Sequence, residues 1–179
     1  MTYKEAIIDA MGWLSERPNT LFIGQSVGVK GSYMFGSLEK VSMEKRLELP
    51  VAEELQMGIT LGMALEGVVP VSIYPRIDFL LLALNQLVNH IDKIGVMSDG
   101  KMKPRIIIRT SIGSRTPLHG GPQHTNDYTR EIRSMCPHLG VIALDADLPP
   151  ELIISEYKRA YNRSDNMPVS LLVEQGDLY

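Results

Sequence analysis

The sequence predicts an α/β domain in which a mostly parallel sheet lies between layers of helices. Short apolar runs rich in β-branched residues alternate with longer segments in which apolar residues recur at helical spacing. Each connection has the length that a right-handed crossover between parallel strands needs. With 179 residues and an ordinary globular composition, the chain is expected to form one domain over residues 1–179.

The chain begins with a predicted helix. Thr2 followed three residues later by Glu5 resembles a capping box, and apolar residues at helical spacing continue to about Glu16. Residues 21–23 form an apolar run that predicts a buried strand. Residues 25–41 then show no periodicity, which predicts a long loop of the functional or mobile kind.

A second helix is expected over residues 53–66, and it contains Gly58 and Gly62. Two glycines four positions apart leave one helix face without side chains, so we expect that face to lie close against another backbone. A strand over 68–74 follows, and then a long apolar helix over about 77–96.

The second half of the chain continues the alternation. Residues 104–109 include three consecutive isoleucines and predict a buried strand whose carboxyl end opens into a glycine-rich loop. The remaining elements expected are a short helix over 129–135, a strand over 141–144, a helix over about 151–161 and a last strand over 169–173.

Charge and cysteine content limit the possible partners. The formal charge is −3, from 18 Lys and Arg against 21 Asp and Glu, and neither sign gathers in a block. This balance argues against nucleic acid or a membrane and favours small molecules or proteins as partners. The single cysteine, Cys136, is expected to be a buried thiol, and no signal peptide or spanning segment is recognised. A reducing, cytoplasmic location is therefore predicted.

Glu53 is the first candidate for chemistry, because it stands at the predicted start of a helix next to Glu54. Carboxylates in a first helical turn complement the helix dipole, which is worth ~0.3–1 kcal/mol. Alternatively, a partly buried carboxylate here would hydrogen-bond a ring nitrogen of a ligand. The spacing alone favours neither interpretation.

A second candidate region follows the 104–109 strand. It carries Arg109, His119, Gln123 and His124, and ligands of parallel sheets lie at the carboxyl ends of strands. A glycine-rich loop with two histidines could hold a general acid or base or an anion, or could be an ordinary solvated turn. Neither the dinucleotide-binding glycine pattern nor a phosphate-binding loop is present.

Longer motifs give the chain a family resemblance. Leu49-Pro50-Val51-Ala52-Glu53, followed by the glycine-rich stretch 58–71, resembles the Pro-Ile-Ala-Glu segment and glycine-rich helix of 2-oxoacid dehydrogenase beta subunits. Those subunits belong to the thiamine diphosphate enzymes. Further segments match in the same order and at similar spacing, namely 2–6, 23–28, 85–90, 97–100, 105–109 and 120–124.

This resemblance implies a pyrimidine-binding domain of the thiamine diphosphate-binding fold. Glu53 would hydrogen-bond the aminopyrimidine of the cofactor, and His124 would face the substrate. The diphosphate and Mg²⁺ would be held by a partner subunit with a Gly-Asp-Gly motif, which this chain lacks together with the family's second beta-subunit domain. No metal ligand is therefore expected in this chain, and a self-dimer within a heterotetramer is implied.

Three positions depart from the family pattern. An acidic pair usually follows the first strand's glycine, whereas this chain has Gln25-Ser26, which leaves the proton relay between paired sites open. The aromatic residue that packs on the pyrimidine would fall near Ile77, so Tyr74 or Phe79 is expected to supply that contact. His119, Gln123 and Arg109 are weaker candidates for contacting the substrate.

The function that the resemblance implies is activation of the cofactor for decarboxylation of a small-molecule 2-oxoacid, with aldehyde release or carboligation, in an enzyme active only with its partner chain. Transketolase-like ketol transfer is an alternative, although that group usually has Gly-Ile-Ala-Glu-Gln where this chain has Pro-Val-Ala-Glu-Glu. A second alternative is a non-catalytic scaffold domain that pairs with a diphosphate-domain partner.

Overall fold

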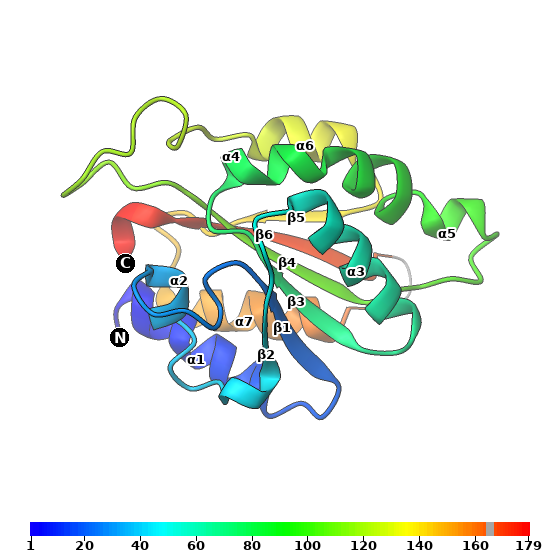
Figure 1. Cartoon of the computed structure of the whole chain (residues 1–179), viewed down its shortest axis with the longest axis horizontal. Coiled ribbons are helices and arrows are strands. Elements are labelled where there is room, and N and C mark those ends of the chain that lie inside the picture. Colours follow the sequence, from blue (N-terminus) through cyan, green and yellow to red (C-terminus); the bar gives the residue numbers. More distant parts are fainter. Residues whose placement is uncertain (164–166) are drawn as a thin grey trace.

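A computed structural model describes residues 1–163 and 167–179 (Figure 1). In this part of the chain six strands form one sheet, and all of the neighbouring strands are parallel. The strands, in their order across the sheet, are β2 (Arg46–Glu48), β1 (Thr20–Gly24), β3 (Val69–Ile73), β4 (Ile106–Ile112), β6 (Val169–Gln175) and β5 (Gly140–Ala143). The predicted α/β class with helices on both faces of the sheet is confirmed.

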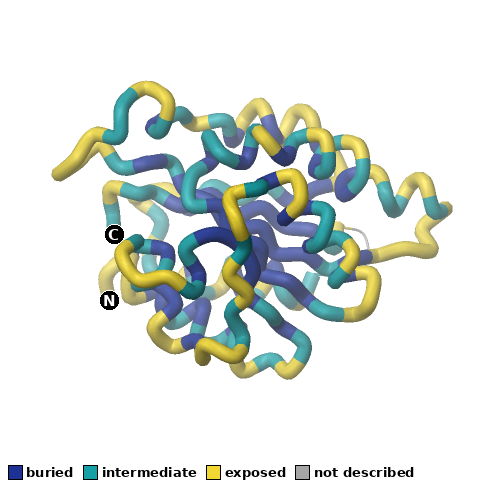
Figure 2. The backbone as a smooth tube through the Cα atoms, in the orientation of Figure 1, coloured by how far each residue is buried: buried dark blue, intermediate teal, exposed yellow. Residues whose placement is uncertain are grey.

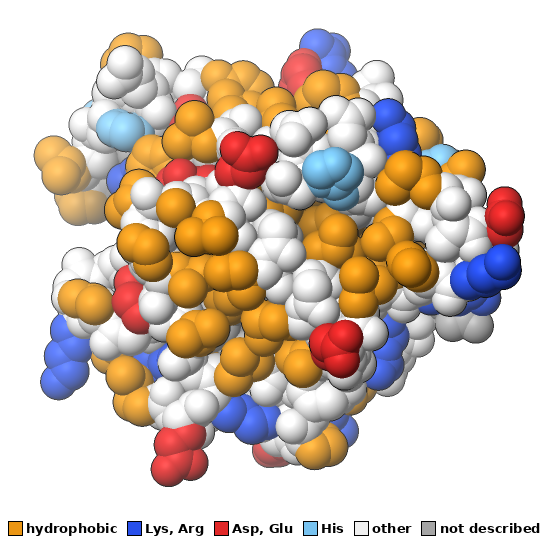
Figure 3. Space-filling view, turned by 45° about the vertical axis from the view of Figure 1, so that its right-hand side comes forward, with side chains coloured by type: hydrophobic (Ala, Val, Ile, Leu, Met, Phe, Trp, Pro, Cys, Tyr) orange, Lys and Arg blue, Asp and Glu red, His pale blue; other side chains and the backbone are white. Residues whose placement is uncertain are grey.

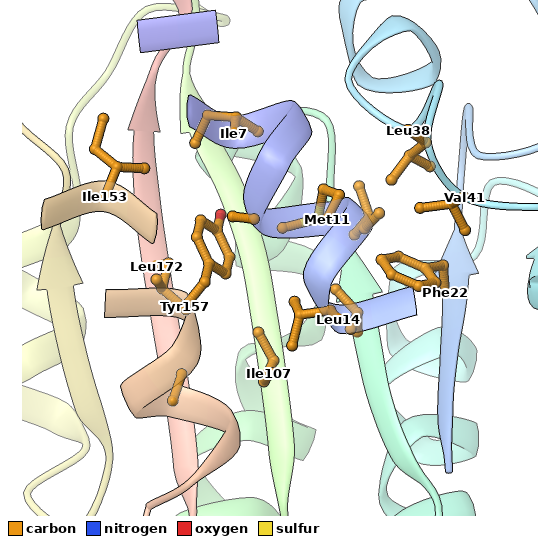
Figure 4. Close-up of a cluster of buried hydrophobic side chains, with 14 of the residues drawn as sticks. Ile7, Met11, Leu14, Phe22, Leu38, Val41, Ile107, Ile153, Tyr157 and Leu172 are labelled. Atoms are coloured by element: carbon orange, nitrogen blue, oxygen red, sulfur yellow. The ribbon is translucent and has the colours of Figure 1, made fainter. Parts of the chain in front are cut away.

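One face of the sheet is covered by α1 (Tyr3–Ser15) and α7 (Pro150–Tyr161). The capping box of α1 forms as predicted: the Thr2 hydroxyl accepts a hydrogen bond from the Glu5 N–H, and the Thr2 N–H donates to Glu5 Oε2 at 2.7 Å. Figure 4 shows the core between these helices and the strands, and all of the following side chains in it are inaccessible to solvent: Ile7, Met11, Leu14, Phe22, Ile107, Tyr157 and Leu172.

The other face carries α3 (Glu53–Leu65), α6 (Thr129–Met135) and an irregular helical segment. This segment was predicted as one long helix, which is wrong. It consists of α4 (Ile77–Leu80), a 3₁₀ turn (Leu81–Ala83), a π-helical stretch (Gln86–Ile91) and α5 (Ile94–Met97). Apolar spacing marks the buried face of such a segment, but it does not specify which carbonyl each N–H bonds.

The loop over residues 25–41 is also more ordered than its lack of periodicity suggested. It contains α2 (Tyr33–Gly36), and Met34 and Leu38 within it are fully buried. The Arg46 guanidinium donates hydrogen bonds to the carbonyls of Val27, Leu38 and Val41. The loop is therefore packed into the core and held by an edge strand, β2, that the sequence analysis did not predict.

Figure 2 shows buried backbone through the centre of the molecule, along the sheet, and exposed backbone on the loops around it. The prediction for Gly58 and Gly62 is wrong within this chain. A Cβ atom added at either glycine would meet no atom within 4 Å. The bare face of α3 is therefore open rather than packed against another backbone of the chain.

Candidate functional site

The candidate site lies at the carboxyl edge of the sheet, where the strand order changes direction. From β1 the chain passes outward to β2 and then crosses back through α3 to β3, on the other side of β1. Crevices at such switch points are the usual ligand sites of open parallel sheets. Gln25 directly follows β1, Glu53 begins α3 and Tyr74 directly follows β3, so all three residues are placed at this switch point.

Glu53 is held in an unusual environment for a charged residue at a helix start. Its residue surface is only 4% exposed, and its carboxylate accepts a hydrogen bond from Gln25 Nε2 at 3.0 Å on Oε1. Among the described residues, Gln25 is the sole donor to this carboxylate. The backbone carbonyl of Glu53 also accepts a hydrogen bond from the Tyr74 hydroxyl at 3.4 Å.

The neighbouring Glu54 shows what a carboxylate that only complements the helix start looks like. It is exposed and accepts long hydrogen bonds from the side chains of Asn85 and Gln86 at 3.4 and 3.3 Å. Glu53 occupies the same helical turn but is turned inward and shielded from water. Burial of a carboxylate with one neutral donor is costly, so the helix dipole alone does not account for Glu53.

A buried polar network beneath Glu53 fixes the position of α3 on the sheet. Gln56 Nε2 donates to Ser72 Oγ at 3.1 Å and to the Ile73 carbonyl at 2.9 Å, and Thr60 Oγ1 lies 2.9 Å from Ser72 Oγ. Gly24 is required here, because its φ is +144° and an added Cβ would lie 2.2 Å from the Ile73 oxygen. Gln56 was not predicted, because a polar residue within an apolar helical pattern carries no separate signal.

Tyr33 joins the ends of two strands, and it was also missed. Its hydroxyl contacts the Pro75 carbonyl and Ser111 Oγ, and Ser111 Oγ donates to the same carbonyl at 2.8 Å. Burial raises the pKa of the Tyr33 hydroxyl, so it remains protonated and available as a donor. Tyr33 lies in α2, so the packed loop positions the segment that leads to Arg76.

His124 is held from two sides in the loop that follows β4. Its backbone carbonyl accepts a hydrogen bond from Arg76 Nη1 at 3.1 Å, and its ring meets the edge of Phe79 with centroids 5.5 Å apart. Gly113 makes this approach possible, because an added Cβ would lie 1.8 Å from the His124 oxygen and 2.2 Å from Arg76 Nη1. The ring nitrogen Nδ1 is buried and has no hydrogen-bond partner among the described residues, so this polar atom is left unsatisfied.

The structure places the other predicted site residues differently. His119 is exposed and accepts the Gly121 N–H on Nδ1 at 2.9 Å, and Gln123 is exposed on the same loop. Tyr74 and Ile77 have no accessible surface and belong to the core, so they offer no ring or side-chain face to a cofactor. Phe79, which is half-buried beside His124, is the remaining candidate for that contact.

Arg109 requires the clearest correction. It was predicted in the loop at the end of a strand, but β4 continues to Ile112 and Arg109 is a fully buried strand residue. Its guanidinium binds Glu174 through Nε at 2.6 Å and Nη2 at 3.0 Å. The hydroxyls of Tyr157 and Tyr179 contact the same carboxylate. Arg109 Nη1 has no hydrogen-bond partner among the described residues, but the whole side chain is buried in the core and is therefore unavailable to a substrate.

Three further properties concern the whole described chain. Cys136 is buried as predicted, and burial, reinforced by Asp92, raises the pKa of its thiol to about 12. Residues 1–163 and 167–179 contain no group of three or more His, Cys, Asp or Glu side chains arranged to hold a metal ion. None of the helices in these ranges has the length and apolar character needed to cross a bilayer.

The six-stranded parallel sheet flanked by helices matches a transketolase-like α/β fold. Among solved structures, a split gene transketolase described as an inactive beta4 tetramer matches with a TM-score of 0.68 and 16% identity, over 97% of this chain and 51% of that chain. At that identity the match shows the fold alone. No family model matches the chain.

Sequence relatives are more specific. The chain is 30% identical over 132 residues to the pyruvate dehydrogenase E1 component subunit beta-2 of Oryza sativa subsp. japonica, which covers 72% of this chain and 35% of the relative. It is also 30% identical over 129 residues to the 2-oxoisovalerate dehydrogenase subunit beta of Bacillus subtilis, over 70% of this chain and 39% of the relative. The chain is thus a homologue of 2-oxoacid dehydrogenase beta subunits, as the resemblance predicted, and it spans less than half the length of these relatives.

Proposed function

We propose that this chain is the pyrimidine-binding subunit of a split thiamine diphosphate-dependent enzyme that acts on a 2-oxoacid. The observation that carries the proposal is Glu53, a carboxylate 4% exposed at the switch point of the sheet with one neutral hydrogen bond. The homology of the chain to 2-oxoacid dehydrogenase beta subunits supports the same assignment.

The residues at the switch point fit the aminopyrimidine of this cofactor. Glu53 Oε1 is engaged by Gln25, and Oε2 has no hydrogen-bond partner among the described residues, so it can meet a ring nitrogen. Phe79, which is half-buried and in ring contact with His124, is the aromatic residue proposed to pack against the pyrimidine. When bound, the cofactor supplies an electron sink for breaking a carbon–carbon bond next to a carbonyl.

Gln25 limits how a proton moves through this site. Its amide donates a hydrogen bond to Glu53 Oε1, but an amide does not itself take up a proton. Residue 25 therefore does not relay a proton to or from Glu53. We propose that this chain's active sites work without the relay that an acidic residue at this position would provide.

His124 is proposed to act in the substrate half of the reaction. Arg76 holds its backbone and Phe79 limits its ring, so the imidazole is placed at the loop that faces the carboxyl edge. A positioned imidazole can donate a proton or a hydrogen bond to a developing oxyanion. The products proposed are an aldehyde or, after ligation to a second carbonyl compound, a hydroxyketone.

The proposed partners are a second copy of this chain and a subunit that carries the diphosphate and Mg²⁺ on a Gly-Asp-Gly motif. Figure 3 shows hydrophobic side chains gathered across the face that carries α3. Leu55, Leu65 and Leu82 are 54%, 44% and 66% exposed there, beside the open face of Gly58 and Gly62. Large exposed apolar patches mark protein contacts, which supports a heterotetramer of two copies of each subunit.

Ketol transfer of the transketolase kind is a second candidate, and the fold shared with a split gene transketolase is compatible with it. The two candidates share Glu53 and the cofactor and differ in the donor substrate. Turnover of 2-oxoacids against ketose phosphates by the reconstituted enzyme distinguishes them.

Cofactor binding tests the proposal directly. Calorimetric titration of the isolated chain with thiamine diphosphate and Mg²⁺ is expected to give no micromolar binding, because the charged end of the cofactor has no ligands here. Addition of a subunit that carries the Gly-Asp-Gly motif is expected to restore binding. Micromolar affinity of the chain alone, or none after reconstitution of a stable complex, contradicts the proposal.

A further inference from the structure

A pocket lies at the opposite edge of the sheet from Glu53. It has a volume of about 560 Å³ and is lined by residues 91–92 and 94–96 at the end of the irregular helical segment, by Asp99, Gly100 and His138, and by residues 102–104 that lead into β4. Pro168 and Val169, at the start of β6, complete one wall. Because all strands run in parallel, this amino-terminal edge is separate from the carboxyl edge that carries the candidate site.

Asp92 is an incompletely bonded carboxylate in the wall of this cavity. The residue is 4% exposed, and its Oδ1 accepts the backbone N–H of His138 at 2.9 Å. Its Oδ2 is buried and has no hydrogen-bond partner in the described part of the chain. A buried carboxylate oxygen without a hydrogen-bond donor is costly. A cationic donor from a ligand would compensate this cost best, because hydrogen bonds between charged groups are the strongest.

The rest of the cavity selects among cations. Ile91, Ile94, Met102 and Val169 line it with apolar side chains. A hard metal ion requires several oxygen ligands, and the described residues contain no cluster of three or more acidic, His or Cys side chains. Lys103 also lines the cavity, and its positive charge disfavours a ligand with several cationic groups. The cavity therefore favours a ligand with one positive charge, placed at Asp92, and an apolar body.

We propose that this cavity binds a small organic ammonium compound, with the ammonium group paired to Asp92 and the hydrocarbon part against the apolar wall. The site does not depend on the proposed function at Glu53. It is a separate ligand site on the same domain, at the end of the irregular helical segment whose first helix, α4, contains Phe79.

The test is an NMR titration of the full chain with 3-methylbutylammonium chloride, followed through the amides of Gly95 and Gly100, which line the cavity. Saturable shifts in the millimolar range are expected. The neutral isostere 3-methylbutan-1-ol is expected to bind about tenfold or more weakly, because it cannot form the charged hydrogen bond. Potassium chloride at equal concentration is expected to leave both amides unmoved.

Two variants locate the interaction. Asp92→Asn keeps the shape and the acceptor for the His138 N–H, and it is expected to weaken binding of the amine by about tenfold or more. Asp147→Asn, at an exposed carboxylate outside the cavity, is the matched control and is expected to change affinity less than about twofold.

Equal binding of the amine and the alcohol, equal shifts with potassium, or no shift with any probe each overturns the proposal. Unchanged affinity of a folded Asp92→Asn variant overturns it too. If that variant does not fold, the comparison of the three probes on the unmodified chain still decides the matter.

Discussion

Two buried carboxylates of this chain, Glu174 and Glu53, differ in how completely they are bonded. Glu174 has no exposed surface and is met by the Arg109 guanidinium and by two tyrosine hydroxyls. Glu53 is nearly as buried but receives one hydrogen bond, from a neutral amide. A carboxylate surrounded by donors from its own chain contributes to the structure, whereas one left half-bonded is available to a ligand.

The same contrast explains why Arg109 is a poor candidate for contacting substrate. Burial disfavours its charged form, but Glu174 outweighs that effect and holds the pKa of Arg109 above its ordinary value. Tyr179 bonds both members of the pair and contacts the ring of Tyr33 at 4.8 Å between centroids. The closed pair therefore supports the loop that reaches the candidate site without entering it.

The largest expected effect comes from opening the closed pair. Arg109→Met leaves Glu174 as an uncompensated buried charge, which is expected to lower the free energy of unfolding by about 3–5 kcal/mol. Urea denaturation of the full chain measures this loss. Arg130→Met is the matched control, because the Arg130 side chain is 91% exposed and its pair with Glu131 is expected to contribute about 0–1 kcal/mol. A similar small loss in both variants would show that the buried pair is not structural.

The half-bonded carboxylate should show the opposite behaviour. Glu53→Gln preserves the shape of the side chain, so unfolding by urea is expected to change by less than about 1 kcal/mol. In the reconstituted enzyme, hydrogen exchange at the thiazolium carbon of the cofactor is expected to slow by ~10² or more, because the charged acceptor is lost.

Glu54→Gln is the control for this variant, since Glu54 occupies the same helical turn but is exposed. It should leave the exchange rate within about twofold of the unmodified enzyme. Near-normal exchange in a well-folded Glu53→Gln enzyme would mean that another group activates the cofactor. A large loss of stability in this variant would mean that Glu53, like Glu174, has a structural role.

The fold could be predicted from the sequence largely because its signals are local. Capping by Thr2 and Glu5, the isoleucine run of β4 and the apolar spacing of α7 each act within one element. Where hydrogen-bond register decides the structure, as in the π-helical stretch Gln86–Ile91, apolar spacing was insufficient. The short edge strand β2 gave no signal because its three residues are exposed or only partly buried.

The candidate site was predicted less completely, because long-range partners decide it. Glu53 and His124 were predicted from their positions at a helix start and in the loop after a strand, and were given roles through family motifs. The bonds of Gln25, Arg76 and Tyr33, in contrast, join positions 28 to 78 residues apart. Arg109 was misplaced for the same reason, since its partner Glu174 lies 65 residues away. Patterns within a segment do not report which distant side chain will neutralise a charge.

The smallest expected effect concerns a third carboxylate, Asp177. It is exposed, so it compares a surface carboxylate with the buried carboxylates Glu174 and Glu53. Its Oδ1 accepts backbone hydrogen bonds from Arg115 at 2.5 Å and Thr116 at 2.9 Å, and it thereby ties the start of the His124 loop to the C-terminal turn. The backbone N–H of Thr116, then that of Arg115, holds the pKa of Asp177 below its ordinary value. A carboxyl whose pKa is lowered in the folded state stabilises the fold above its ordinary pKa, and it loses that contribution as the pH falls through the lowered value.

Acidification should therefore loosen this loop while the buried pair stays closed. Between pH 7 and pH 3, protection of the Arg115 and Thr116 amides against hydrogen exchange, corrected for intrinsic rates, is expected to fall about threefold, because the bonds lose their charge. Asp177→Asn should show lower protection that no longer depends on pH. Asp127→Asn, which alters another exposed carboxylate that bonds a backbone amide, that of Thr129 at the start of α6, is expected to leave the pH dependence at residues 115 and 116 intact. If the two variants behave alike, the loop is held by contacts other than Asp177, and its position beside His124 is then set by Arg76 and Gly113.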